Sequence, residues 1–195
     1  LYGAHYYTEI ERMGDFHYIH MCLEVADQQY LGVGVPDVLA RGMAFLNEII
    51  SMPAGDGVSF REDYLVQEKR VLSEIIADCF NDKIAYAQRR CIEEMCRGEA
   101  IALSPLGDVA DFPTIEAADL LTFHRQILAS NRLDIFMSGD IDEEQALNLA
   151  VQLINWQRNP ESAAGEEPAL HSPSTGRQVF EYRGVQQATL VAGYR

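Results

Sequence analysis

The sequence lacks any long hydrophobic run, although 48 % of its 195 residues are hydrophobic. No segment approaches the ~20 consecutive apolar residues that a membrane-spanning helix requires, so we expect no membrane-embedded segment. Basic residues are also scarce: 15 Lys and Arg stand against 30 Asp and Glu, and the net charge is −15. This charge argues against binding to nucleic acid or to an anionic membrane surface, and it is compatible with a soluble, cytoplasmic protein.

Cysteine is rare, and no two cysteines form a C-x-x-C pair. Cys79 and Cys91 fall on apolar helical faces, where a free cysteine behaves as a small hydrophobic side chain. We therefore predict buried thiols in a reducing compartment, in place of a disulfide framework or a cysteine metal site. The four cysteines are Cys22, Cys79, Cys91 and Cys96.

The common catalytic motifs are missing as well, including H-E-x-x-H, H-x-x-E-H, G-x-S-x-G and a Walker-type glycine loop. His17 and His20 form an H-x-x-H sequence inside a predicted strand. Strand residues three apart point to opposite faces, so these two histidines are not expected to share a metal ion. The 195 residues alone therefore supply no complete catalytic or metal site.

The most regular stretch covers residues 60–98, where apolar residues recur at helical spacing in two sets. This pattern predicts two helices that meet near residues 80–83, each with one face to bury. Asn81 and Asp82 are suited to end the first helix and to cap the second. Within the first helix, Glu74 is the one residue that raises a question of chemistry.

Further elements follow from alternation, capping residues and turn residues. Residues 5–13 and 16–25 predict a hairpin that turns at Gly14-Asp15. Helices are predicted over 36–52, with Pro36 in the first turn, over 114–130, capped by Thr114, and behind Asp142 to about residue 156. His124 lies on the apolar stripe of the second of these helices, and we interpret it as a packed core residue. A short strand is predicted over 133–138.

The chain changes character near its end. Residues 157–177 are rich in Pro, Ser, Ala, Gly and Glu and read as a linker. Residues 178–183 and 187–194 then predict two strands. Because the sequence begins at Leu1 and stops inside a strand-like run, we expect it to be a piece of a longer protein.

Short groups of residues occur in a fixed order over nearly the whole chain. They are Leu1-Tyr2-Gly3-Ala4, Phe60 with Gln67-Glu68-Lys69 and Leu72, Asn81-Asp82-Lys83 with Tyr86-Ala87 and Arg90, Phe123-His124, Asp134-Ile135-Phe136 with Gly139-Asp140, and Gln186-Gln187 to Gly193-Tyr194-Arg195. In this order they resemble the insulinase/pitrilysin superfamily of zinc peptidases, whose motif is H-x-x-E-H. The similarity is greatest to the bacterial inactive-domain subgroup, the elongation factor P 5-aminopentanol modification-associated proteins.

The resemblance implies an α+β fold, an antiparallel sheet with helices packed on one face, as in the α/β roll of LuxS/insulinase-type metalloenzymes. Residues 1–156 would form most of a first peptidase-like domain whose N-terminal part is missing. Residues 157–177 would be the linker, and 178–195 would begin a second domain or supply returning strands.

In active members of this superfamily, the third zinc ligand is a Glu within a segment similar in sequence to Val71-Leu72-Ser73-Glu74-Ile75. The H-x-x-E-H histidines supply the other two ligands. The resemblance thus gives Glu74 a ligand position only if H-x-x-E-H lies upstream of Leu1. The subgroup generally lacks that motif, and Ser73 stands where active members prefer an acidic residue. We therefore expect no catalytic residue, no metal and no cofactor, with Glu74 a structural helix residue.

The strand that begins at Gly3, Ala4, His5 and Tyr6 corresponds to the sheet edge on which superfamily members add a substrate peptide. The resemblance therefore implies a non-catalytic, peptide-binding subunit that partners an active zinc peptidase homologue or associates with itself. One alternative is an active zinc metallopeptidase with Glu74 as third ligand. Another is an accessory factor for protein modification. Nucleic acid and membranes are not expected partners.

Overall fold

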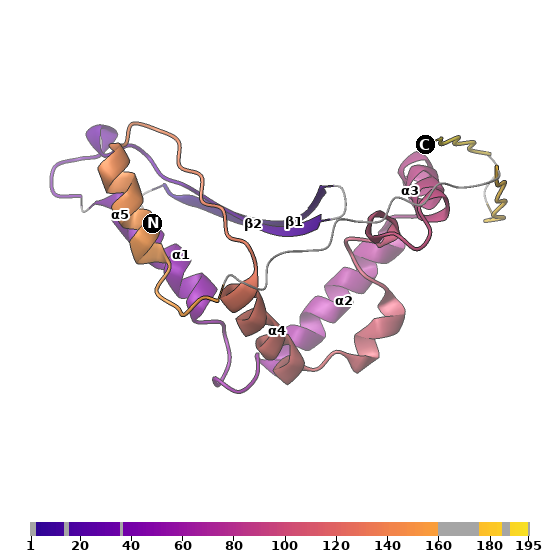
Figure 1. Ribbon diagram of the computed structural model, residues 1–195, viewed down its shortest axis with the longest axis horizontal. Helices are drawn as coiled ribbons and strands as arrows, with labels where there is room; N and C mark the ends of the chain where they lie inside the picture. Colours follow the sequence, from indigo (N-terminus) through magenta and orange to yellow (C-terminus); the bar gives the residue numbers. More distant parts are fainter. Residues whose placement is uncertain (1–2, 14–15, 36, 160–175, 185–187, 195) are drawn as a thin grey trace. The chain divides into compact units, whose positions relative to one another are not determined.

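The computed structural model describes residues 3–13, 16–35, 37–159, 176–184 and 188–194. The Gly14-Asp15 turn, Pro36 and most of the predicted linker lie outside these residues. Two paired strands and five α-helices confirm the predicted α+β class (Figure 1). The elements are β1 (His5–Met13), β2 (Phe16–Glu24), α1 (Val38–Ser51), α2 (Glu62–Asp78), α3 (Lys83–Met95), α4 (Ala117–Ser130) and α5 (Glu143–Leu153), with the short 3-10 helices η1 (Gln28–Tyr30), η2 (Ala100–Ala102) and η3 (Val109–Thr114).

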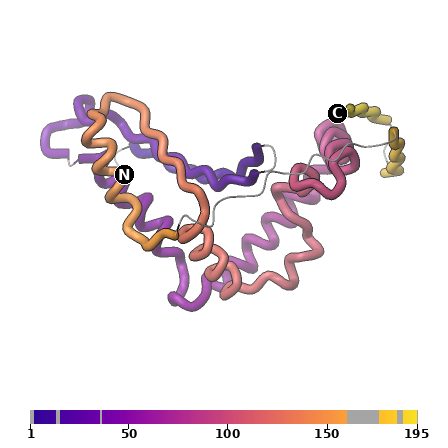
Figure 2. The backbone as a smooth tube through the Cα atoms, viewed as in Figure 1, coloured from indigo at the N-terminus to yellow at the C-terminus, as the bar shows by residue number. Residues whose placement is uncertain are grey.

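The chain divides into two compact units, and the hairpin contributes residues to both. Unit 1 contains residues 1–9, 19–62 and 116–165. Unit 2 contains residues 10–18, 63–115 and 166–195. The hairpin strands run without a break through both sets of residues, as the trace in Figure 2 shows.

The core of unit 1 lies where α1 meets α5. Met43 and Leu46 of α1 and Leu149 and Leu153 of α5 are buried together. Each face follows from helical spacing, since these positions lie three or four residues apart. Partly buried side chains from the hairpin, from the first turn of α1 and from the segment before α5 complete the cluster: Tyr6, Leu23, Leu39, Ala40, Ile135, Met137 and Ile141.

Gly42 allows α1 to approach the hairpin closely. A Cβ atom at this position would lie 2.6 Å from Cδ2 of Leu23 and 3.3 Å from Cγ1 of Val25. Glycine is unfavourable inside a helix by about 1 kcal/mol relative to alanine. The close packing against β2 explains why a glycine is accommodated in this helix.

Unit 2 is built on α2, α3 and the 3-10 helices. Leu65 of α2, Phe112 of η3 and Cys96 after α3 are its buried apolar residues in the described part of the chain. Lys69 extends from α2 to donate a 2.6 Å hydrogen bond to the carbonyl of Ile115. Arg12 from the hairpin donates to the carbonyls of Ile101 and Leu103, at 2.5 and 2.7 Å.

Helix boundaries follow the predicted caps in two cases. Asp82 accepts hydrogen bonds from the backbone N–H groups of Ile84 and Ala85 at the start of α3. Asp142 accepts from Glu144 and Gln145 at the start of α5. Both carboxylates satisfy donors that a helix otherwise leaves without partners.

One predicted helix start is wrong, and another falls outside the described residues. Helix α1 begins at Val38 with Asp37 as its cap, and the predicted place of Pro36 in the first turn is not among the residues that the structure describes. Helix α4 begins at Ala117, because Thr114 belongs to η3, where its hydroxyl donates to the carbonyl of Asp111. In addition, α5 ends at Leu153, three residues before the predicted end.

The later predicted strands are also corrected. Residues 133–138, 178–183 and the described part of 187–194 form no ladder with any strand that the structure describes. Residues 135–137 still alternate between buried and exposed side chains, since Ile135 and Met137 pack on the core while Phe136 is 91 % exposed. Alternation fixes which face is buried, but a strand also requires a hydrogen-bonded neighbour, which a local pattern does not reveal.

The four cysteines are free thiols, of which Cys96 is buried while Cys22, Cys79 and Cys91 are only partly buried, so the predicted burial holds in full for Cys96 alone. No helix in the described residues is long and apolar enough to cross a membrane.

Candidate functional site

Glu74 lies on an open surface of α2. Its carboxylate forms an ion pair with Arg70, with 2.7 Å between Oε1 and Nη1, and the two side chains are 62 % and 66 % exposed. Residues four apart on a helix face the same direction, which places the two groups together. The geometry is that of an ordinary surface ion pair, a contact that contributes little to stability.

Among the described residues, no complete set of zinc ligands surrounds Glu74. A catalytic zinc ion takes three protein ligands, and Glu74 offers one carboxylate that already accepts from Arg70. No cluster of three His, Cys, Asp or Glu ligands in the described part of the chain includes Glu74. Histidines His5, His17 and His20 belong to the hairpin strands and His124 to α4, while His171 is outside the described residues.

The predicted peptide-binding edge maps to the start of β1. His5 and Tyr6 are its first residues, and Gly3 and Ala4 precede it, with Gly3 at a φ of 77°. Tyr6 faces the core of unit 1, where its ring packs edge-on against Phe45 with centroids 5.9 Å apart. In the described residues β1 pairs only with β2, so its other edge has backbone groups without a strand partner.

The opposite face of the hairpin within unit 1 is polar. His5 lies across from Glu24, with 4.0 Å between Nδ1 and the carboxylate, and Tyr7 lies beside Cys22. The hydrogen bond with the Cys22 side chain, together with nearby negative charge, raises the pKa of Tyr7 to about 12. Both contacts bring a side chain of β1 next to one of β2 on the same face of the hairpin.

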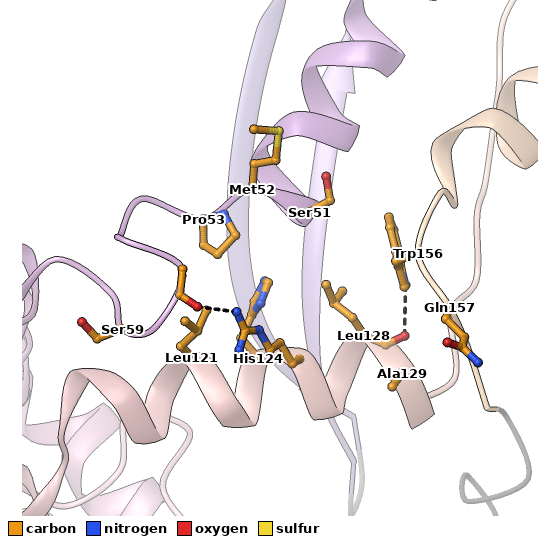
Figure 3. Close-up of a pocket in the computed structure, with 12 residues that line it drawn as sticks. Ser51, Met52, Pro53, Ser59, Leu121, His124, Leu128, Ala129, Trp156 and Gln157 are labelled. Atoms are coloured by element: carbon orange, nitrogen blue, oxygen red, sulfur yellow. Dashed lines mark hydrogen bonds between the residues drawn. The ribbon is translucent and has the colours of Figure 1, made fainter.

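A pocket of about 460 Å³ in unit 1 did not emerge from sequence reasoning. Its walls come from the end of α1 and the following loop, from one side of α4, and from the segment after α5 (Figure 3). The lining residues are Ser51, Met52, Pro53, Gly57, Ser59, Leu121, His124, Arg125, Leu128, Ala129, Trp156 and Gln157. The available signal was the single tryptophan of the chain, Trp156, but its neighbours are distant in sequence.

His124 lies in the wall of this pocket, half-buried and edge-on to the ring of Phe60. Burial lowers the pKa of its imidazole, and Arg125 adds to this effect, although a hydrogen bond to the backbone of Ile50 raises the pKa. Nδ1 is buried without a hydrogen-bond partner among the described groups. The expected packed position is therefore correct, but one ring nitrogen is left unsatisfied.

In unit 2, helix α3 holds the segment at residues 176–184 through a charged network that the sequence did not suggest. Glu181 accepts from the Tyr86 hydroxyl at 2.7 Å and from Nε of Arg90 at 2.6 Å. Both hydrogen bonds lower the pKa of Glu181, and the one from Tyr86 has the larger effect. Arg183 lies over the rings of Phe80 and Tyr86, at 5.1 and 5.9 Å. Glu181 thus connects its own segment to α3 residues that lie more than ninety positions earlier in the chain.

Comparison with family models shows a similarity over the C-terminal part of the chain. Residues 114–195 match the model described as the Peptidase M16 inactive domain. The matched region begins in η3 and includes α4 and α5.

Two relatives extend the similarity over more of the chain. The curated protein "Probable inactive metalloprotease YmfF" of Bacillus subtilis (strain 168) is 29 % identical over 197 residues, covering 100 % of this chain and 45 % of that protein. A solved structure, "Crystal structure of a conserved protein from Enterococcus faecalis V583", matches with a TM-score of 0.73 and 26 % identity over 84 % of this chain and 38 % of that one. The chain spans less than half the length of these relatives.

Proposed function

We propose that this chain is a non-catalytic, peptide-binding part of its protein, starting from its resemblance to the insulinase/pitrilysin-type peptidases. The match of residues 114–195 to the Peptidase M16 inactive domain and the similarity to the "Probable inactive metalloprotease YmfF" support that resemblance. The observation that carries the non-catalytic role is the geometry of Glu74, which is paired with Arg70 on an open helix surface. As part of the proposal, the protein acts in the cytoplasm beside an active zinc peptidase homologue.

Peptide binding in this proposal uses the free edge of β1. An extended peptide that adds to a sheet edge is held by backbone hydrogen bonds, which need no catalytic side chain. The edge begins beside His5 and Tyr6, and the inward ring of Tyr6 anchors the strand on the unit 1 core. A chain without a complete zinc site can therefore still hold a substrate for a partner.

Two further functions remain alternatives. An active zinc peptidase would need H-x-x-E-H outside the 195 residues, with Glu74 released from Arg70; the exposure of both side chains permits such a release. An accessory role in protein modification would use the same peptide-binding edge without any peptidase partner. Copurification of the full-length protein with a peptidase homologue would favour the partnered role over the accessory role, and its consistent absence would reverse that preference.

The first prediction concerns zinc. We expect full-length protein, purified and equilibrated with zinc, to retain well below one ion per chain by elemental analysis. Glu74→Gln should leave that content unchanged, since the carboxylate pairs with Arg70 and not with metal. Glu68→Gln, on the same helix, is the matched control. One zinc per chain that is lost only on Glu74→Gln would establish the active-peptidase alternative.

The second prediction concerns the β1 edge. An extended peptide ligand should lose affinity when alternate backbone nitrogens are methylated, because each methyl group removes a donor that faces the sheet. Methylation of the other alternate set, whose N–H groups face away, should be tolerated. Isothermal titration with the two methylated peptides separates the cases, and mass spectrometry should find the peptide intact. Equal losses from both sets would rule out strand addition.

A further inference from the structure

We propose that the unit 1 pocket binds a small aromatic carboxylate, with the ring against the indole of Trp156 and the carboxylate on Arg125. This inference depends neither on peptide binding nor on zinc. The volume of about 460 Å³ lies in the range of small-molecule sites. The close-up in Figure 3 shows Leu128, His124 and Leu121 along α4, with Trp156 beside them.

The walls of the pocket favour a flat apolar group. Leu121 and Leu128 come from α4, and Met52 and Pro53 come from the loop after α1. The indole N–H of Trp156 already donates to the carbonyl of Leu128 at 3.0 Å. Its polar group is therefore satisfied, and the rest of the ring offers apolar contact area.

The charge of the pocket selects an anion. Although the chain holds 30 acidic residues, none lines this pocket, and Arg125 is the one Lys or Arg among its lining residues. The side chain of Arg125 is exposed, and it takes part in none of the ion pairs of the described residues. One Nη atom donates to the carbonyl of Gly57 at 2.7 Å, which fixes the side chain across the loop.

The remaining donors of Arg125 suit a carboxylate. A guanidinium carries five N–H donors in a planar fork that matches the two oxygens of a carboxylate. The contact with Gly57 uses one of them and holds the group at the pocket wall. His124 does not compete with Arg125 for the carboxylate near neutral pH, because burial favours the neutral form of its imidazole.

Trp156 provides the test, because it is the only tryptophan in the chain and lines the pocket. Phenylacetate and its uncharged analogue phenylacetamide are titrated into the full chain, and tryptophan fluorescence is excited where neither probe absorbs. Phenylacetate should change the emission saturably, and phenylacetamide should bind about tenfold more weakly, since it loses the charge-assisted hydrogen bonds. Equal binding of the two probes, or no saturable change with phenylacetate, would overturn the proposal without a variant.

A pair of variants localises the charge. Arg125→Gln should abolish the preference for phenylacetate over phenylacetamide. Arg132→Gln, which removes a positive charge that pairs with Asp134 outside the lining residues, should keep the preference. Discrimination that survives in Arg125→Gln, with the circular dichroism of the variant unchanged, would place the carboxylate elsewhere and refute the assignment. Because neither measurement involves peptide or zinc, failure here would leave the proposed function unaffected.

Discussion

At the scale of single residues, His124 is the side chain whose environment most changes its chemistry. Its imidazole is half-buried against Phe60, and burial favours the neutral form. The sequence predicted the packing, because residues 120, 121, 124, 127 and 128 form one helical stripe. It could not predict the neighbour Phe60 or the contact with Ile50, since both lie more than sixty positions away along the chain.

The third prediction follows from His124. Its pKa is below the ordinary 6.5 in the folded state, so the unfolded state binds more protons once the pH falls through that value. Unit 1 should therefore lose stability on acidification below about pH 6.5, with Arg125 as the positive charge that faces the imidazole. In His124→Phe this part of the loss should disappear, whereas it should persist in the exposed control His17→Phe. Urea unfolding at pH 7.5 and near pH 5.5 measures the difference, and identical pH slopes in both variants would contradict it.

At the scale of elements, the sequence predicted helices better than strands. The starts of α3 and α5 could be predicted from Asp82 and Asp142, because a helix cap bonds to backbone donors only two or three residues away. Thr114 was wrongly predicted to cap α4, because its hydroxyl donates a hydrogen bond to a carbonyl within η3. The strand predictions over 133–138, 178–183 and 187–194 required knowledge of distant partners, which periodicity does not contain. Glu181 illustrates the limit, since in the structure it serves as an anchor on α3.

The fourth prediction is made on the cap of α3. Asp82→Ala removes the acceptor of two backbone N–H groups and should destabilise the fold by about 1 kcal/mol. Amide exchange at Ile84 and Ala85 should accelerate most, because these donors lose their partner. Asp78→Ala removes the same charge at the end of α2 without removing a helix cap, so it serves as the control. The cap assignment would be wrong if both variants showed the same exchange rates.

At the scale of the whole molecule, the fold class was predictable but the division into units was not. The α+β class followed from ordered groups of residues that resemble a known superfamily, and the observed strands and helices confirm it. The two units each combine hairpin residues with helices from distant parts of the sequence. Such a division depends on tertiary packing, which a reading in chain order does not give.

The fifth prediction concerns the net charge of −15. Like charges repel one another in the folded chain, and raising ionic strength from about 0.01 M to about 0.1 M shortens the screening length from about 30 Å to about 10 Å. The free energy of unfolding by urea should therefore increase with salt over this range. An equal osmolality of sucrose is the uncharged reference for non-ionic effects. A decrease with salt would mean that attractive pairs, such as Arg90 with Glu181, outweigh the repulsion.

The anchor of Glu181 on α3 has a consequence for synthesis on the ribosome. Tyr86 and Arg90 are made more than ninety residues before the carboxylate that joins them. Helix α3 can form as soon as its own residues emerge, because its hydrogen bonds and its Asp82 cap are local. The side chains of Tyr86 and Arg90 have no carboxylate partner in this network until Glu181 has been translated. The nascent chain therefore exposes this face for seconds, at the usual rate of ~5–20 residues per second, and the last contacts to form in unit 2 are those of its final segment.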